Sequence, residues 1–382
     1  MKQDKPYQYW LMNIKGPGKK RKTELIGKLG GAKEIYKASE KTLSSLAGEK
    51  AAASILEAKK NWDIFTEYEE LCRQKIKFTC YGDPDYPGRL LEIPDAPFGL
   101  YYQGRLPSDN IPAVALIGAR ACSEYGIYAA REFGSKLAQT GIQIISGLAM
   151  GIDGISQEAA LLAGGKSFGV LGSGVDICYP KSNRALYEKC KQQGGILSEY
   201  PPGTKPQASL FPPRNRIISG LSDLIVVVEA REKSGTLITV DMALEQGREV
   251  LAVPGRITDS LSRGCNQLFR QGAGVAVSPA DVLEALYGIG APINIEETAQ
   301  NNGRKWRREL EEMQCNMLSG REKQVYEKLE ILPKTPEEIF RQIRSELTIQ
   351  EVMCILVELC LKGLAEQKPE GYCKKSLQLK KN

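Results

Sequence analysis

Short apolar runs alternate with helical stretches between residues 113 and 277, and this alternation limits the fold more than any other feature of the sequence. The runs are bounded by Gly, Pro or Ser: Ala113–Ile117, Ile142–Ile145, Phe168–Leu171, Leu224–Val228, Val250–Val253 and Val275–Val277. Helical patterns lie between several of them: Tyr125–Gln139, Gly154–Ala163, Asn183–Gln193 and Thr239–Gln246. Continuous apolar strands separated by helices predict a parallel sheet with helices on both faces. We therefore expect a doubly wound α/β domain, whose ligands bind beyond the carboxyl ends of the strands.

The flanking segments predict two smaller domains. Residues 1–80 have the pattern of a small helical domain of helix-hairpin or SAM-like type, and the α/β domain then occupies residues 81–290. A polar stretch, 291–317, is typical of a linker. Residues 318–378 contain a hairpin around Gly371 and three amphipathic helical patterns, which together predict a winged helix: Ser319–Leu329, Thr335–Arg344 and Ile349–Lys362. Winged helices contact both DNA and proteins, so this fold alone decides no function.

A glycine-containing turn, Gly16-Pro17-Gly18, precedes a basic run, Lys19–Lys22, and a helical stretch, Thr23–Leu29. Such a turn before a helix N-terminus can hold a phosphate with its free N–H groups. The same pattern also forms a simple connection between two helices. The sequence leaves both interpretations open.

The residue types present exclude several kinds of chemistry. The 382 residues include no histidine, which excludes Ser-His-Asp and Cys-His mechanisms. None of the ten cysteines forms a Cys-x-x-Cys pair, so we expect no zinc site. Because the sequence has neither an apolar signal core nor an apolar span, we expect a cytoplasmic protein without a membrane partner.

Cations and glycines gather where the predicted strands end. The net charge of +6 is uneven, since residues 1–80 carry +7 and residues 81–382 carry −1, so a nucleic-acid site in the α/β domain needs a local cluster of cations. The candidate residues follow the first three strands in order: Gly118, Arg120 and Ser123, then Gly147, then Ser173, Lys181, Asn183 and Arg184. Glycines let the backbone approach a phosphate, and helix N-termini add partial positive charge. The spacing matches neither a dinucleotide fingerprint nor a P-loop, so we expect no nucleotide cofactor.

A second cluster, Phe211 followed by Arg214, Asn215 and Arg216, stands just before a packing segment that is either a helix or a strand. Phe211, Tyr179 and Phe168 are candidates for stacking on bases, with core packing as the alternative for Phe168. One of the two arginines can instead pair with a carboxylate such as Glu199 or Glu229. Ser234-Gly235-Thr236 precedes a further helix and is either an anion seat or a plain N-cap.

As a set, these motifs resemble the DprA family (DNA-processing protein A, also called Smf) of bacterial natural transformation. The resemblance covers about 110–280 in order and rests on these runs: Ile117–Arg120, Ser146–Ala149, Gly151–Asp153, Tyr179–Lys181, Asn183–Arg184, Leu197–Gly203, Phe211–Pro212, Arg214–Ser222, Ser234–Thr236, Ala243–Val250 and Val253–Gly255. It implies a Rossmann-like domain that binds incoming single-stranded DNA, forms a homodimer and loads the RecA recombinase. It also implies a DNA path along Arg120, Lys181, Asn183, Arg184, Asn215 and Arg216.

Two positions depart from the family pattern. Gln157 stands where the family often has histidine, and a helix-packing role can be met by glutamine. Ala119 stands where the family often has serine or threonine, so one hydroxyl contact to a phosphate is missing.

The leading hypothesis is a DNA-binding recombination mediator without catalytic residues. An alternative is a nucleotide-processing enzyme of related fold, with Asp153, Glu199 or Glu245 as acid or base. A third is a regulator that binds double-stranded DNA through its winged helix. The sequence does not favour it, because no helix of that domain carries a run of base-reading Arg or Asn, and a role in protein contacts is the alternative for that domain. For the dimer interface, the apolar stretch Leu268–Val277 near the sheet edge is the candidate.

Overall fold

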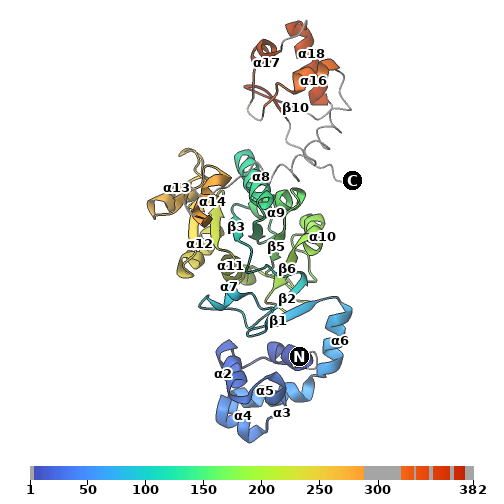
Figure 1. Cartoon of the computed structure of the whole chain (residues 1–382), viewed down its shortest axis with the longest axis vertical. Coiled ribbons are helices and arrows are strands. Elements are labelled where there is room, and N and C mark those ends of the chain that lie inside the picture. The colour runs from blue at the N-terminus through green and yellow to red at the C-terminus, as the bar shows by residue number, and fades with distance from the viewer. Residues whose placement is uncertain (1–3, 288–319, 331–332, 344–346, 362–364, 375–382) are drawn as a thin grey trace. The chain divides into compact units, whose positions relative to one another are not determined.

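The computed structural model describes residues 4–287, 320–330, 333–343, 347–361 and 365–374. The chain divides into two compact units, Met1–Asn302 and Gly303–Asn382 (Figure 1). The predicted linker, 291–317, lies outside the described residues.

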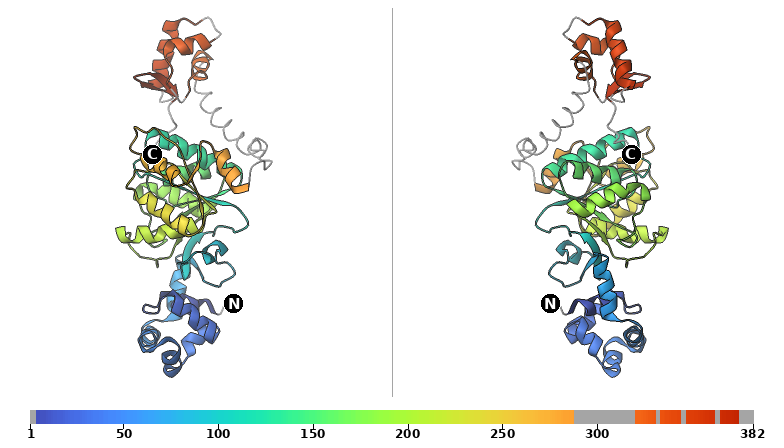
Figure 2. Two further views of the ribbon diagram at one scale, coloured as in Figure 1. Left: turned by 90° about the vertical axis from the view of Figure 1, so that its left-hand side faces the viewer. Right: turned by 90° about the vertical axis from the view of Figure 1, so that its right-hand side faces the viewer.

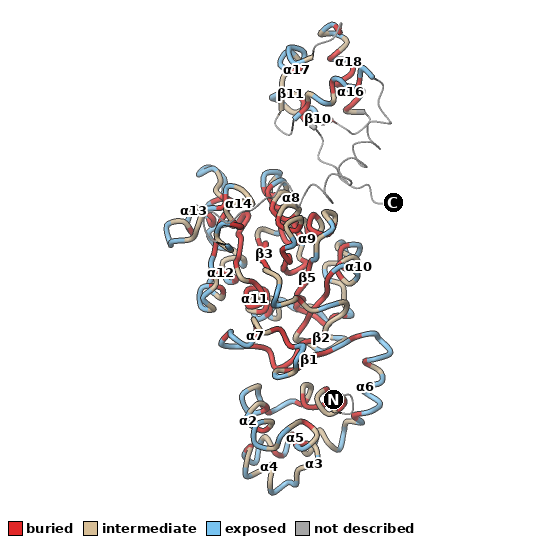
Figure 3. Tube along the Cα trace, in the orientation of Figure 1, coloured by how far each residue is buried: buried red, intermediate tan, exposed pale blue. Residues whose placement is uncertain are grey.

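Helices form the N-terminal part of the first unit: α1 (Lys5–Asn13), α2 (Lys19–Leu29), α3 (Ala32–Lys37), α4 (Glu40–Ala47), α5 (Glu49–Asn61) and α6 (Ile64–Arg73). They surround a core in which Trp10, Ile35 and Leu43 are fully buried (Figure 3). The same core continues to the sheet, because it also contains Phe78 and Tyr101. The Tyr101 hydroxyl donates to Asn13 Oδ1 at 2.6 Å. The helices therefore belong to one compact unit with the sheet.

A single sheet contains the strands of this unit: β1 (Lys77–Cys80), β2 (Gly99–Gly104), β3 (Ala113–Ile117), β4 (Gln143–Ser146), β5 (Ser167–Val170), β6 (Gly195–Ser198), β7 (Leu224–Val227), β8 (Glu249–Ala252) and β9 (Gly274–Val275). Their order is β1-β2-β6-β5-β4-β3-β7-β8-β9. All pairs from β6 to β9 are parallel, and β2 pairs antiparallel with both β1 and β6. The chain winds from β3 to β6 in one direction and then from β7 to β9 in the other, so the reversal lies between β3 and β7.

Helices cover both faces of the sheet. Alternate side chains of a strand point to opposite faces, and the two sets pack on different helices. On one face Val114 and Leu116 share a core with Phe133 of α8 (Glu124–Gln139). On the other face Ala115 shares a core with Ile217 of α11 (Phe211–Gly220). Figure 2 shows the layers from two further sides. Further helices among the described residues of this unit are α7 (Gly88–Leu91), α9 (Ile152–Leu162), η2 (Lys181–Asn183), α10 (Arg184–Gln193), η3 (Ala208–Leu210), α12 (Gly235–Glu245), α13 (Arg263–Arg270) and α14 (Pro279–Tyr287).

The predicted strands agree with the observed ones to within two residues, but three strands were missed. β1 lies inside the segment predicted to be helical. β6 has only two large apolar residues, Ile196 and Leu197, between Gly195 and Ser198, which is too short an apolar run to predict a strand. The arginine cluster also differs from expectation, since Arg214 and Arg216 lie within α11 and do not precede it. Pro212 and Pro213 occupy its first turn, where a missing N–H costs no hydrogen bond.

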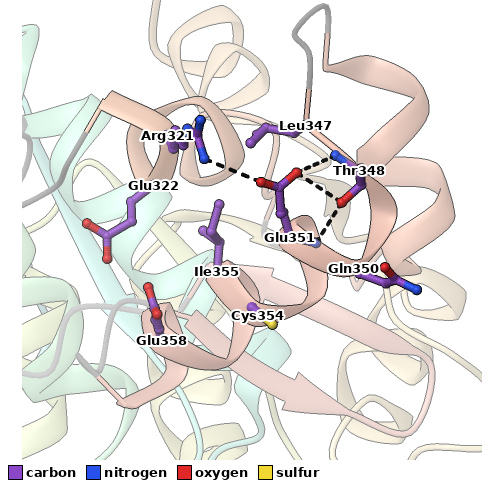
Figure 4. A pocket seen from close by; sticks show the side chains of 9 residues that line it. All are labelled: Arg321, Glu322, Leu347, Thr348, Gln350, Glu351, Cys354, Ile355 and Glu358. Atoms are coloured by element: carbon purple, nitrogen blue, oxygen red, sulfur yellow. Dashed lines mark hydrogen bonds and ion pairs between the residues drawn. The ribbon is translucent and has the colours of Figure 1, made fainter.

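The described residues of the second unit form three helices and a hairpin: α16 (Gly320–Tyr326), α17 (Pro336–Gln342), α18 (Ile349–Leu361), β10 (Ala365–Lys368) and β11 (Gly371–Lys374). Val325, Ile339 and Val352 are fully buried in its core. A depression of about 350 Å³ lies between α16 and α18, crossed by an ion pair of 3.3 Å between Arg321 and Glu351 (Figure 4). α18 contains no Lys or Arg, so this helix offers no cation to a phosphate.

Within the part of the chain that the structure describes, no helix is long and apolar enough to cross a membrane. Nor do the described residues include a group of His, Cys, Asp and Glu side chains that could hold a metal ion.

Candidate nucleic-acid interface

Three loops meet beyond the carboxyl ends of β3, β4 and β5, because parallel strands end at the same edge of a sheet. We call these loops, residues 118–123, 147–151 and 171–183, together with Arg184 and Phe211, the strand-end rim. The Ile152 N–H donates to the Ala119 carbonyl at 3.2 Å, which ties the first loop to the second. Gly151 lies at this junction with a φ of 75°, and a Cβ there would overlap the carbonyl oxygens of Ala119 and Arg120. The close approach requires glycine, and it fixes the backbone that carries Arg120.

An aromatic pair lies on the rim. The rings of Tyr179 and Phe211 are stacked, with centroids 5.7 Å apart and planes inclined by 24°. Tyr179 is 46% exposed. The guanidinium carbon of Arg120 lies 5.5 Å from the centroid of Phe211. A stacked pair with one exposed ring beside a guanidinium can hold an unpaired base together with its phosphate. Phe168, the other stacking candidate, is buried in the core, as its alternative interpretation expected.

The position of Phe211 depends on a glycine far away in the sequence. A Cβ at Gly172 would come within 2.7 Å of Phe211 Cδ1, so the ring packs directly on the backbone after β5. No sequence pattern connects these two residues. The structure therefore adds Gly172 to the residues that shape the rim.

Arg214 lies under the rim and is 5% exposed. Its guanidinium donates to the carbonyls of Gly147, at 3.0 Å, and of Val170, and its Nε donates to Asn215 Oδ1 at 3.1 Å. These contacts join the ends of β4 and β5. Burial lowers the pKa of Arg214 to about 10, while the nearby carboxylate of Asp153 raises it. Arg214 thus remains charged at neutral pH and holds the loops from below, whereas a contact with a ligand stays a prediction.

Asp153 is a buried acidic group near this arginine. It is 8% exposed and accepts a hydrogen bond from the Gly147 N–H at 3.1 Å. Burial raises its pKa, and the charge of Arg214 counteracts this effect. A buried carboxylate that accepts from the backbone and lies near a fixed cation serves the loop structure.

Two side-chain amides hold the loop after β4. Asn183 Nδ2 donates to the carbonyls of Leu148 and Ala149, both at 3.0 Å. Gln157, fully buried, accepts from the Leu148 N–H at 3.0 Å and donates to Ser167 Oγ at 3.0 Å and to the Phe168 carbonyl at 3.1 Å. Gln157 therefore has a structural role at the position where the family pattern often has histidine.

Lys181 and Arg184 are exposed on the same rim. Together with Asp176, Ile177 and Cys178 they line a shallow depression of about 390 Å³. Neither cation forms an ion pair with another described residue, so both are available to an anion. Tyr179 and Lys181 belong to the same loop after β5, two residues apart in the chain.

Three predicted residues make contacts within the protein. Ser123 caps α8 and donates from Oγ and N–H to the carboxylate of Glu229. Ser173 is buried, and its hydroxyl donates to the carbonyl of Ile177 at 3.3 Å. A Cβ at Gly118 would lie 2.7 Å from Ile152 Cγ1, so this glycine permits close packing of the first loop on α9.

Arg216 makes the ion pair that the sequence left open. Its Nη2 lies 2.7 Å from Glu199 Oε2 and its Nε lies 3.0 Å from Asp95 Oδ2. Burial raises the pKa of Glu199, and Arg216 counteracts this effect. The expected carboxylate partner thus belongs to Arg216, while Glu229 bonds to Ser123. At the remaining candidate anion seat, Ser234 caps α12 by accepting from the Thr236 N–H at 3.2 Å.

The structure thus exposes Arg120, Lys181 and Arg184 on the strand-end rim, with half-buried Phe211 beside Arg120. Asn183 and Arg214 hold the loops of the rim by hydrogen bonds to backbone carbonyls. Fold and rim together define a Rossmann-like α/β protein with a cationic, aromatic surface at its strand ends.

Comparison with known proteins narrows this class to one family. The model of a family described as DNA recombination-mediator protein A matches residues 77–287, and the chain belongs to this family. It is 37% identical to Protein Smf of Synechocystis over 289 residues, which are 74% of this chain and 73% of that protein. It is 45% identical to the DNA processing protein DprA of Streptococcus pneumoniae over 215 residues, 56% of this chain and 76% of the relative.

A solved structure supports the same relationship. The X-ray structure of DNA processing protein A from Streptococcus pneumoniae matches with a TM-score of 0.65 at 36% identity, covering 73% of this chain and 96% of that one. The resemblance expected from the sequence motifs is therefore confirmed, as is the α/β fold with a mostly parallel sheet.

Proposed function

We propose that this chain binds single-stranded DNA along the strand-end rim and acts as a recombination mediator. The observation that carries the proposal is the Tyr179–Phe211 stack, with the Tyr179 ring exposed and Arg120 beside Phe211. Only an unpaired strand can offer a base to such a stack, because the bases of a duplex are already stacked and paired. Lys181 and Arg184 extend the surface with charges that suit the phosphates on either side of that base.

The direct test is a fluorescence-anisotropy titration with a labelled single-stranded oligonucleotide of mixed sequence, at two salt concentrations, with duplex as competitor. We expect salt-sensitive binding, and we expect Arg120→Ala and Lys181→Ala each to weaken it for all sequences alike. Matched controls lie at the amino ends of the strands, away from the strand-end rim. Exposed Lys166 precedes β5, and exposed Arg105 lies beside the start of β6. Equal affinity of the wild type, the rim variants and the control variants would refute the assigned surface.

The same proposal includes delivery of the strand to RecA by a cytoplasmic homodimer. The family description, a recombination mediator, supports the delivery. For the dimer we propose the edge at β9, where Val275 and Val277 are 50% and 69% exposed, although Leu268 of the predicted patch is buried. Sedimentation of wild type and Val277→Asp tests the dimer. RecA filament formation on an oligonucleotide coated with single-strand-binding protein tests the delivery.

From the strand order we further assign the sheet to the doubly wound class. From the order of its helices and hairpin we assign the second unit to the winged helices. Binding without catalysis is part of the proposal. Asp153 and Glu199, two of the three candidate acids, are held by contacts within the protein. Release of a free base from any member of a nucleotide panel would favour the nucleotide-processing alternative.

A further inference from the structure

The N-terminal helices carry a second cationic surface that the proposed single-strand site does not use. The first 80 residues hold a net charge of +7, whereas the remainder of the chain holds −1. Two turns lie on this part of the molecule: Gly16–Gly18 precedes α2, and Gly48 precedes α5. We call these turns, with Lys15, Lys20, Arg21 and Lys50, the hairpin surface.

Contacts between the two turns place them side by side. Arg21, in the first turn of α2, donates from Nη1 to the Ala47 carbonyl just before the second turn. A Cβ at Gly48 would lie 3.5 Å from Arg21 Nη1, and a Cβ at Gly16 would lie 2.5 Å from Ser54 Oγ on α5. Each glycine turn therefore packs against the helix that the other turn begins. The amino ends of two helices thus meet at one place.

The cations of this surface lie at the N-terminus of α2, where the potential of the helix is already positive. α2 begins with Lys19, Lys20, Arg21 and Lys22, has no acidic residue in its first turn, and has no side-chain cap. Cations at a helix N-terminus are unfavourable, because the helix dipole is positive there. Such a local conflict is typical of a functional surface, and a bound anion removes it.

Not all of these cations are free. Lys22 is buried and donates to the Met12 carbonyl at 2.9 Å, and the Lys19 ammonium lies 5.1 Å from the Tyr81 ring centroid. Lys15, Lys20 and Lys50 are exposed and form no ion pair with any residue that the structure describes. Glu49, also exposed, is the acidic neighbour in the first turn of α5.

We propose that the hairpin surface binds the phosphate backbone of double-stranded DNA. The chemistry favours a duplex over a second single-stranded segment for one reason. None of the large apolar side chains exposed in the described structure lies on the two turns, so the surface offers cations and backbone N–H groups but no platform for a base. Contacts to phosphates alone suit a duplex, which presents about one negative charge per 1.7 Å of its axis and hides its bases. With the rim binding an unpaired strand, the full chain holds a junction between single-stranded and double-stranded DNA.

The test uses the full chain and two probes, a blunt mixed-sequence duplex and a single-stranded oligonucleotide. We expect the wild type to bind both. Lys20→Ala/Lys50→Ala should weaken duplex binding about 10- to 30-fold near 0.15 M salt and lower the salt slope by about two, with single-strand binding unchanged. The matched control is Lys28→Ala/Lys60→Ala, which removes two exposed lysines from the same helices. The control lysines lie about 12 Å and 15 Å further along α2 and α5.

The outcomes separate the two proposals. Loss of duplex binding in the hairpin variant but not in its control supports the hairpin surface, whatever the rim variants do. No duplex binding by the wild type, or equal loss in both double variants, overturns it. A chain that keeps duplex binding but shows no single-strand binding contradicts the rim proposal alone.

Discussion

Replacing Tyr179 by alanine tests the stacking surface without removing a charge. One face of the Tyr179 ring lies against Phe211, at a centroid distance of 5.7 Å, and the side chain is otherwise 46% exposed. We expect the other face of the Tyr179 ring to stack on one base of the bound strand. Stacking of a base on an aromatic side chain contributes about 1–3 kcal/mol. Since Phe211 remains in the variant, we expect a loss of about 1–2 kcal/mol, or roughly 5- to 30-fold in the dissociation constant for single-stranded DNA.

The assay is the anisotropy titration at several salt concentrations. Because tyrosine carries no charge at neutral pH, the slope of log affinity against log salt should stay unchanged, in contrast to Arg120→Ala. The matched control is Tyr128→Ala, since Tyr128 is also 46% exposed but lies on α8. Tyr179→Phe should retain nearly full affinity. An equal effect of the two alanine variants, or a change in salt slope for Tyr179→Ala, would refute the stacking argument.

Three further predictions concern residues that shape the fold around the rim. Gln157→Leu should lower the free energy of unfolding by about 2–4 kcal/mol in urea titrations, because it leaves a buried N–H and a buried carbonyl without partners. Gly172→Val should reduce single-strand affinity about as much as loss of the Phe211 ring, since its Cβ would lie 2.7 Å from that ring. Burial lowers the pKa of Lys22 to about 8. A lowered folded pKa favours the neutral amine in the folded state, so stability rises with pH above about 8, by about 2 kcal/mol between pH 7 and pH 9.5, and Lys22→Met should abolish this rise.

Each of these has a contradicting result. A Gln157 variant as stable as the wild type would mean that water replaces the lost hydrogen bonds. Unchanged affinity of the Gly172 variant would separate the ring from the binding surface. A Lys22 variant that keeps the full rise in stability between pH 7 and pH 9.5 would assign the pH dependence to another group.

The candidate site was only partly predictable from the sequence. Arg120, Lys181 and Arg184 were expected on the strand ends and are exposed there. Arg214 and Arg216, two residues apart, were indistinguishable in sequence. In the structure one holds two backbone carbonyls under the rim and the other bonds to Glu199 and Asp95. Residues i and i+2 on a helix point about 200° apart, so the two guanidinium groups meet different surroundings.

What the sequence determined by itself is the local order of the chain. Apolar periodicity depends on nearest neighbours, so it located β3, β4, β5, β7 and β8, and the order of strands and helices then required a parallel sheet. Parallel strands must end at one edge, which is why the loops after β3, β4 and β5 could be expected to meet. The family motifs in those loops were likewise visible in the sequence.

Only the tertiary structure decided which partners the polar side chains take. The contact of Gly172 with Phe211, the hydrogen bonds of Asn183 to the loop after β4, and the bond from Arg21 to the Ala47 carbonyl join residues 26 to 39 positions apart. Such contacts leave no periodic signal, because they depend on how separately formed elements pack and not on the residues beside them in the chain. Packing thus determines which cations remain exposed for DNA and which hold the protein together.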